Sequence, residues 1–114
     1  RAVQRIDRII VSTDSQEIAN VAKEYGAEVP FIRPEQIAGD TSPEWLAWRH
    51  ALNYLHCTEG KLPNVMISIP CTAPLRLPID IENCLDEYEK GDVDVVVTVS
   101  DAYRSPFFNM VNVI

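Results

Sequence analysis

Arg33 is the side chain whose setting in this sequence most clearly favours ligand chemistry. It lies between Ile32 and Pro34, and the proline favours an extended backbone at the arginine. An arginine held in this way can offer a planar fork of N–H donors to a phosphate or to the carbonyl of a nucleotide base. The structural alternative is a surface arginine that forms an ion pair with Glu28 or Glu35.

The sequence Asp40-Thr41-Ser42-Pro43 indicates the start of a helix. Ser42 is a good capping residue, and a proline suits the first helical position. The N–H groups at such a helix end are free and the dipole there is positive, which suits a phosphate or a carboxylate. We therefore expect Asp40, Thr41 and Ser42 to shape an anion site, with plain helix capping as the alternative.

A second polar loop, at 70–77, joins an apolar run to another expected helix. Its two prolines stiffen the backbone, while Thr72 and Arg76 supply polar groups. Loops that follow the carboxyl ends of parallel strands are where open α/β sheets bind ligands. The alternative is a rigid turn in which Arg76 pairs with Asp80.

Strand patterns place both loops at the edge of a sheet. Runs at 9–12, 29–32, 64–70 and 93–99 read as strands. Those at 9–12, 64–70 and 93–99 are expected to be buried, and the run at 64–70 is typical of a central parallel strand. A further strand is expected at 107–114. Because helices alternate with these strands, we predict one α/β domain with a mostly parallel sheet covered by helices on both faces.

Three helices are expected between the strands. The first is capped by Asp14 or Ser15 and ends before Gly26, the second starts near Pro43, and the third opens at Pro78. Gly60 and Gly91 follow the second and third helices. The side chains expected to face inward are Ile18, Val21, Ala22 and Tyr25; Trp48, Ala51, Leu52 and Leu55; and Ile81, Cys84, Leu85 and Tyr88.

The composition restricts the classes of function. Lys and Arg number 10 against 17 Asp and Glu, a net charge of -7, so a nucleic-acid-binding surface is not expected. Separated cysteines without a CxxC pair predict reduced thiols in a cytoplasmic protein and no zinc site. No apolar run is long enough to cross a membrane. Because the chain begins with Arg1 rather than Met, we expect the native N-terminus to lie upstream.

Several runs of this sequence form an ordered set. They are IIVSTD at 9–14, IA at 18–19, AKEYGAEVPF at 22–31, RP at 33–34, DT at 40–41, TAPLR at 72–76, VVTV at 96–99 and SPF at 105–107. In this order and spacing they resemble the acylneuraminate cytidylyltransferases, also called CMP-sialic acid synthetases. The resemblance covers nearly the whole chain.

The resemblance implies a nucleotide-diphospho-sugar transferase fold, which is a Rossmann-like three-layer α/β/α sandwich. It implies transfer of CMP from CTP to a nine-carbon sugar acid such as N-acetylneuraminate, with Mg²⁺ and release of pyrophosphate. It assigns Arg33, Asp40, Thr41 and Ser42 to the nucleotide site, and Thr72, Ala73 and Arg76 to the sugar-acid site. It assigns no catalytic residue to this chain. Family members often pair as homodimers, which this chain neither supports nor denies.

The chain departs from the family pattern at three places. The family opens with a strand and a triphosphate-gripping loop that are absent here, and its metal-binding carboxylates come after the point where this chain stops. We therefore expect residues 1–114 to be a partial domain that is inactive alone, with the Mg²⁺ ligands outside it. Pro70 stands where many members carry a substrate-contacting glutamine. This difference predicts a relative that acts on another sugar acid.

Three alternatives stay open. One is a nucleotidyltransferase of the same fold for another sugar or base. Another is a non-catalytic module that binds a nucleotide or a partner protein. The third is a flavodoxin- or receiver-like domain, which Lys90 disfavours because it lies at a helix end instead of a strand end. The residues encoded on either side of this chain would separate the first two.

Overall fold

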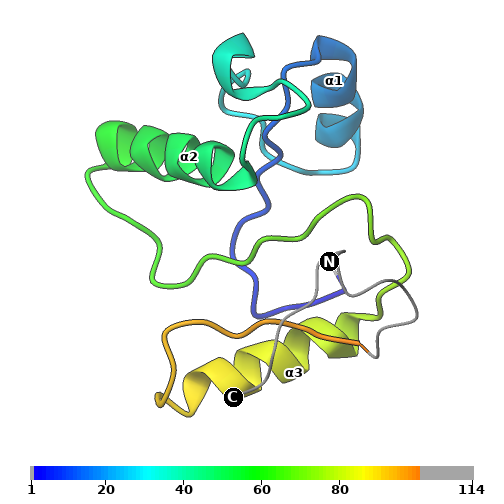
Figure 1. Ribbon diagram of the computed structural model, residues 1–114, viewed down its shortest axis with the longest axis vertical. Coiled ribbons are helices and arrows are strands. Elements are labelled where there is room, and N and C mark those ends of the chain that lie inside the picture. The colour runs from blue at the N-terminus through cyan, green and yellow to red at the C-terminus, as the bar shows by residue number, and fades with distance from the viewer. Residues whose placement is uncertain (1, 101–114) are drawn as a thin grey trace. The chain divides into compact units, whose positions relative to one another are not determined.

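A computed structural model of the chain describes residues 2–100, and its helices are shown in Figure 1. The helices within these residues are α1 (Gln16–Glu24), α2 (Glu44–Glu59) and α3 (Pro78–Glu89), with a short 3-10 turn, η1 (Glu35–Ile37). The expected strand at 107–114 lies outside the described residues. Among residues 2–100, no helix combines the length and apolar character that a membrane crossing requires.

The chain divides into two compact units. One is Gln4–Thr72, which contains α1, η1 and α2. The other, called here the α3 unit, combines Arg1–Val3 with Ala73–Ile114.

Both ends of α1 follow from the sequence. Ser15, one of the two expected caps, accepts a hydrogen bond on its Oγ from the N–H of Ile18 at 3.3 Å. At the other end Gly26 adopts a φ of +83°, a conformation that an L side chain disfavours. The predicted start and end of this helix are therefore confirmed.

The predicted inward face of α1 is mostly wrong, because only Ala22 of its four side chains is half-buried. Ala19 is completely buried, whereas Ile18, Val21 and Tyr25 are 55%, 48% and 88% exposed. Apolar periodicity locates a helix, but the face that packs is set by how closely the chain can approach it. In α1 the small Ala19 is the fully buried residue, and the larger side chains of Ile18, Val21 and Tyr25 stay exposed.

Helix α2 begins one residue later than predicted. Pro43 has a ψ of 134°, which is extended, so Glu44 is the first helical residue. The prediction that Ser42 caps this helix is wrong, because no side chain caps it and the N–H of Ser42 bonds to the carbonyl of Gly39 at 2.9 Å. Ser42 belongs to the preceding turn, since the extended Pro43 separates it from the helix.

The inward face of α2 is partly as predicted. Leu55 is buried and Ala51 and Leu52 are half-buried, whereas Trp48 is 38% exposed. Ala47 is also buried. As on α1, a buried alanine was not among the side chains predicted to face inward.

Gly60 ends α2 with a φ of 71° and donates its N–H to the carbonyl of His56 at 2.9 Å. We expect Gly60→Ala to destabilise the full-length protein by about 1 to 2 kcal/mol, because a Cβ disfavours this left-handed conformation. A Cβ at Gly60 would meet no atom within 4 Å, so the cost is conformational. Urea unfolding measures the change.

Gly39→Ala is the matched control for this substitution. Gly39 has no positive φ, and its Cβ would lie in ordinary contact with Ser42 Oγ at 3.6 Å. We expect this control to change the free energy of unfolding by less than about 0.5 kcal/mol. Equal losses for the two variants would contradict the conformational explanation.

A parallel pairing joins the segments on either side of α1. Ile10 and Glu28 form a parallel bridge. The N–H of Val11 bonds to the carbonyl of Glu28 at 2.9 Å, and the N–H of Glu28 bonds to the carbonyl of Ile9 at 2.8 Å. The strand expected at 9–12 therefore pairs in parallel across the helix, as a β-α-β unit requires. It is not the buried strand that was predicted, because Ile9 is 44% exposed.

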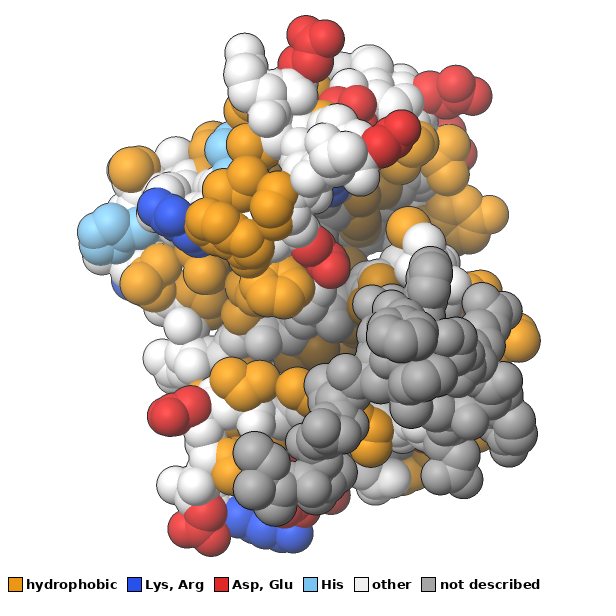
Figure 2. All heavy atoms as spheres, viewed as in Figure 1, with side chains coloured by type: hydrophobic (Ala, Val, Ile, Leu, Met, Phe, Trp, Pro, Cys, Tyr) orange, Lys and Arg blue, Asp and Glu red, His pale blue; other side chains and the backbone are white. Residues whose placement is uncertain are grey.

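The runs at 64–70 and 93–99 are not the buried strands that were predicted. Val65 and Ile67 are 42% and 38% exposed, and Val97 is 70% exposed. Among residues 2–100 the pairing is limited to the one bridge, so a mostly parallel sheet is not shown. A run of this kind gains its burial from neighbouring strands and covering helices. Figure 2 shows apolar side chains at the molecular surface.

In the α3 unit, helix α3 agrees with the prediction. Pro78 is its first residue, and the Asp80 carboxylate accepts the N–H of Leu77 at 2.8 Å, which caps the start. Gly91 follows the end with a φ of +81°. The side chains predicted to face inward are all half-buried, namely Ile81, Cys84, Leu85 and Tyr88.

Candidate functional site

The half-buried side chain of Arg33 is tied to the end of the first strand segment. Its Nε donates to Ser12 Oγ at 3.1 Å, and its Nη2 donates to the carbonyl oxygen of Ser12. The main-chain N–H of Arg33 donates to the carbonyl of Thr13 at 2.8 Å. Within the described residues these partners replace the ion pair with Glu28 or Glu35 that was the alternative.

Two neighbouring features hold the carboxyl end of the strand segment 9–12 in place. Thr13 is 6% exposed, and its Oγ1 accepts the N–H of Ser15 at 3.1 Å, which holds the turn into α1. Phe31 packs edge-on against His50 with ring centroids 4.6 Å apart, and its centroid lies 5.1 Å from that of Tyr54. Since His50 and Tyr54 belong to α2, the segment that leads to Arg33 is packed on that helix.

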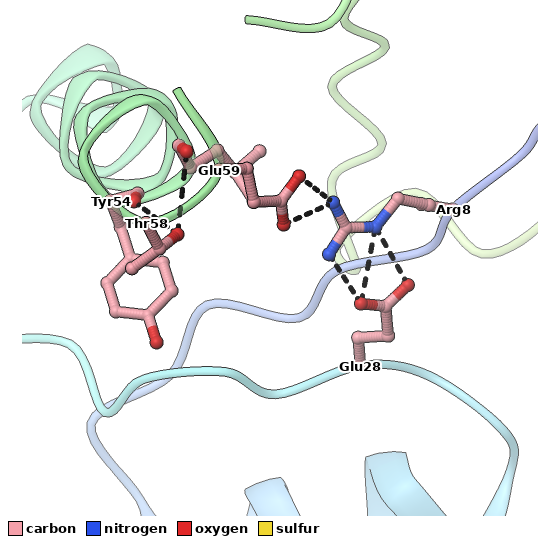
Figure 3. Close-up of polar contacts among 6 residues, drawn as sticks. Arg8, Glu28, Tyr54, Thr58 and Glu59 are labelled. Carbon is pink, nitrogen blue, oxygen red and sulfur yellow. Dashed lines mark hydrogen bonds and ion pairs between the residues drawn. The ribbon is translucent and has the colours of Figure 1, made fainter. Parts of the chain in front are cut away.

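Arg8 lies near the amino end of the parallel pairing of Ile10 with Glu28, and Figure 3 shows its contacts. Its guanidinium bonds to Glu28 at 2.6 Å and to Glu59, the last residue of α2, at 2.8 Å. The hydrogen bonds to Glu28, and then those to Glu59, raise the pKa of Arg8 above its usual range. Along the parallel pair, Arg8 therefore ties the amino end to α2, while Ser12 and Arg33 meet at the carboxyl end.

The segment from Asp40 to Ser42 lies in the turn before α2, and not at the helix end where it was expected. Asp40 and Thr41 are exposed, while Ser42 is half-buried and its N–H bonds to Gly39. The structure records no hydrogen bond between Arg33 and these three residues within the described part of the chain. They share with Arg33 the connection to α2, which turns through η1.

The start of α2 already has an acidic neighbour. Glu44, its first residue, accepts a hydrogen bond on Oε1 from Ser68 Oγ at 3.3 Å. A carboxylate in the first turn offsets the positive end of the helix dipole. This helix end is therefore a weaker anion site than its sequence predicts.

The loop that contains Arg76 is closed by that arginine. Arg76 Nε and Nη2 donate to the carbonyl of Ala73 at 3.0 and 2.8 Å. Thr72 and Ala73 are exposed, and Arg76 is half-buried. Ala73 and Arg76 belong to the α3 unit, and Thr72 is the last residue of Gln4–Thr72. Arg76 thus shapes the loop in which it was predicted to bind a ligand.

The remaining reactive side chains form no further centre within residues 2–100. No group of three or more His, Cys, Asp and Glu side chains is placed there to hold a metal ion. Cys57, Cys71 and Cys84 are free thiols. The Nδ1 atom of His50 is buried without a hydrogen-bond partner, beneath the Phe31 ring contact.

A comparison with known protein families decides what this chain is. Residues 1–110 match the cytidylyltransferase family. This chain belongs to that family. The match excludes the receiver-like alternative and agrees with the nucleotide-diphospho-sugar transferase class of fold that the sequence predicts.

Relatives from this family are similar in sequence to this chain over most of its length. The post-translational flagellin modification protein B of Campylobacter coli is 36% identical over 109 residues, which is 92% of this chain and 45% of that protein. The CMP-N,N′-diacetyllegionaminic acid synthase of Campylobacter jejuni is 36% identical over 110 residues, with 92% and 45% covered. The synthase of the same name from Legionella pneumophila is 36% identical over 100 residues, with 88% and 42% covered. The chain spans less than half of each relative.

Sequence reasoning missed Ser12 and Arg8. Ser12 is 21 positions from Arg33, and nothing local to either residue predicts the contact. The β-α-β pattern was the available signal, because it brings the carboxyl ends of two successive parallel strands to one edge. Applied to the segments around α1, that rule places Ser12 beside Arg33.

Proposed function

We propose that the protein containing this chain transfers CMP from CTP to a sugar acid and releases pyrophosphate. The observation that carries the proposal is the Ser12–Arg33 contact in a member of the cytidylyltransferase family. This contact holds the Arg33 guanidinium, with its paired N–H donors, at the end of a strand segment, where α/β proteins bind ligands. Two relatives are named CMP-N,N′-diacetyllegionaminic acid synthase, and these names support the same reaction.

In this reaction a hydroxyl oxygen of the sugar acid forms a bond to the α-phosphorus of CTP. The bond from that phosphorus to the bridging oxygen of the β-phosphate breaks, the hydroxyl proton passes to water, and pyrophosphate leaves. Charge develops on the leaving group, so fixed donors and cations lower the barrier. We assign Arg33 to binding of CTP, through a phosphate or the base carbonyl, with Asp40, Thr41 and Ser42 lining the nucleotide.

Mg²⁺ would neutralise charge on the triphosphate in such a reaction. The described residues do not fit this role, because they gather no group of ligands for a metal ion. We therefore propose that the ligands lie elsewhere in the full-length protein. Arg33 and Arg76 have no part in binding the metal.

The proposed acceptor is a sugar acid of the N,N′-diacetyllegionaminic type. The relatives with that name support this choice over N-acetylneuraminate. The replacement of the family glutamine by Pro70 supports it as well, because proline has no side-chain donor for a substrate. Thr72, Ala73 and Arg76 are the proposed sugar-acid residues, in a loop that Arg76 keeps closed.

The family also supports a proposed three-layer α/β/α arrangement for the full-length protein. In that arrangement each of the apolar runs at 64–70 and 93–99 would be a strand that neighbouring elements cover. This would explain why they are rich in valine and isoleucine, which suit buried parallel strands.

A panel of acceptors tests the proposed function. Full-length protein is incubated with CTP, Mg²⁺ and either N,N′-diacetyllegionaminate or N-acetylneuraminate, and pyrophosphate is measured. We expect at least about tenfold higher kcat/KM for the diacetylated acid, since unpaired polar groups at a mismatched site are costly. Faster reaction with N-acetylneuraminate would overturn the substrate assignment and leave the transfer reaction standing.

A further inference from the structure

Ser12 fixes the orientation of the Arg33 guanidinium. The side chain of Ser12 accepts a hydrogen bond from Arg33 Nε at 3.1 Å, and its main-chain carbonyl accepts one from Nη2. The N–H of Arg33 also donates to the carbonyl of Thr13 at 2.8 Å. The backbone and the far end of the arginine are therefore held by the same short stretch of chain.

This arrangement leaves one edge of the guanidinium available. An arginine carries five N–H donors in one plane, and the bonds to Ser12 use one on Nε and one on Nη2. Among the described residues no acceptor is recorded for the three others, which lie on Nη1 and Nη2. Two of them form the fork that binds paired oxygens, as in phosphate.

The surroundings of Ser12 keep this edge in place. Ser12 itself is half-buried, Thr13 beside it is 6% exposed, and Phe31 packs on α2 two residues before Arg33. An arginine that is already held loses less side-chain freedom when a ligand binds. Its fork also meets the ligand in a single orientation.

We propose that Ser12 is a positioning residue for CTP binding, acting through Arg33. It holds the Nε side of the guanidinium so that the Nη1–Nη2 edge meets CTP. This inference rests on the proposed function, in which Arg33 binds CTP. Ser12 itself does not touch the nucleotide.

The test measures CTP binding by isothermal titration with the full-length protein, and kcat separately by pyrophosphate release. Ser12→Ala removes the hydroxyl and keeps the carbonyl bond. We expect it to raise the Kd for CTP about five- to twentyfold, with kcat at saturating CTP within about twofold. Ser12→Thr retains the hydroxyl and is expected to keep the Kd within about twofold of the wild type.

A double-mutant cycle separates positioning from a general structural role. If Ser12 acts through Arg33, adding Ser12→Ala to Arg33→Ala should change the Kd by less than about twofold. Full additivity of the two substitutions would overturn the proposal, and so would an unchanged Kd for Ser12→Ala alone.

Ser15→Ala is the matched control, because Ser15 caps α1 beside the same turn without touching Arg33. It is expected to lower Tm and leave the Kd for CTP within about twofold. A rise in Kd as large as that of Ser12→Ala would overturn the specific role of Ser12. Binding of CTP without turnover would defeat the proposed reaction alone, and a wild-type protein that binds no CTP would defeat both.

Discussion

Arg33→Ala in the full-length protein is expected to raise the KM for CTP roughly 30- to 150-fold. The substitution removes a charged fork, and losing one or two charge-assisted hydrogen bonds costs about 2 to 3 kcal/mol. The KM for the sugar acid should stay within about twofold, because Arg33 is assigned to the nucleotide alone. Initial rates of pyrophosphate release, with each substrate varied in turn, measure both constants.

Two further variants sharpen this prediction. Arg33→Lys keeps the charge but loses the planar fork, so its KM for CTP should lie between those of the wild type and the alanine variant. Arg49→Ala removes an arginine that lies over the Trp45 ring, 5.3 Å from its centroid, outside the candidate site. It should leave the KM for CTP unchanged. If Arg33→Ala behaves like Arg49→Ala, Arg33 does not bind the nucleotide.

Arg76→Ala is expected to raise the KM for the sugar acid roughly 10- to 100-fold, with the KM for CTP within about twofold. The arginine closes its own loop through two hydrogen bonds to the carbonyl of Ala73. Its loss therefore removes a cation suited to the substrate carboxylate and also loosens Thr72 and Ala73. The same rate measurements give the result.

A comparison with Arg76→Lys separates these two contributions. Lysine retains the charge but cannot form the two-pronged bond to one carbonyl, so it should recover only part of the KM. Full recovery would mean that charge alone matters and that loop closure does not. An effect on the KM for CTP as large as that on the sugar acid would contradict the assignment of Arg76 to the acceptor.

The helices could be predicted because their signals are local. Ser15 caps α1 and Gly26 follows it with a positive φ, and the patterns that identify both span only a few residues. The error at the start of α2 has a local cause too, since proline is compatible with either a helical or an extended ψ. Pro43 takes the extended value, 134°, and Ser42 is left in the turn.

Strand burial could not be predicted in the same way. The run at 93–99 shows that its residues favour an extended, covered position, but partners from elsewhere in the chain must supply the cover. Val97 remains 70% exposed among the described residues. The prediction for the face of α1 failed as well, because Ala19 is buried while Ile18 and Val21 are exposed.

The candidate site was only partly accessible from the sequence. Arg33 could be proposed from the sequence because a proline follows it in a polar loop, and the resemblance to the cytidylyltransferases assigns it to the nucleotide site. Its true partner, Ser12, depends on the parallel pairing of Ile10 with Glu28, a contact between distant segments. Ser42, the expected cap of α2, lies instead in the turn before the helix, where its N–H bonds to the carbonyl of Gly39.

The most direct test of the central claim is the mass of the product. Full-length protein is incubated with CTP, Mg²⁺ and N,N′-diacetyllegionaminate, and the nucleotide products are separated and weighed by mass spectrometry. Cytidylyl transfer predicts a conjugate with the mass of CMP plus the sugar acid minus water, formed in equal amount with pyrophosphate. CTP that stays intact with every sugar acid tried, although the protein binds it, would contradict the claim and favour a non-catalytic nucleotide-binding protein.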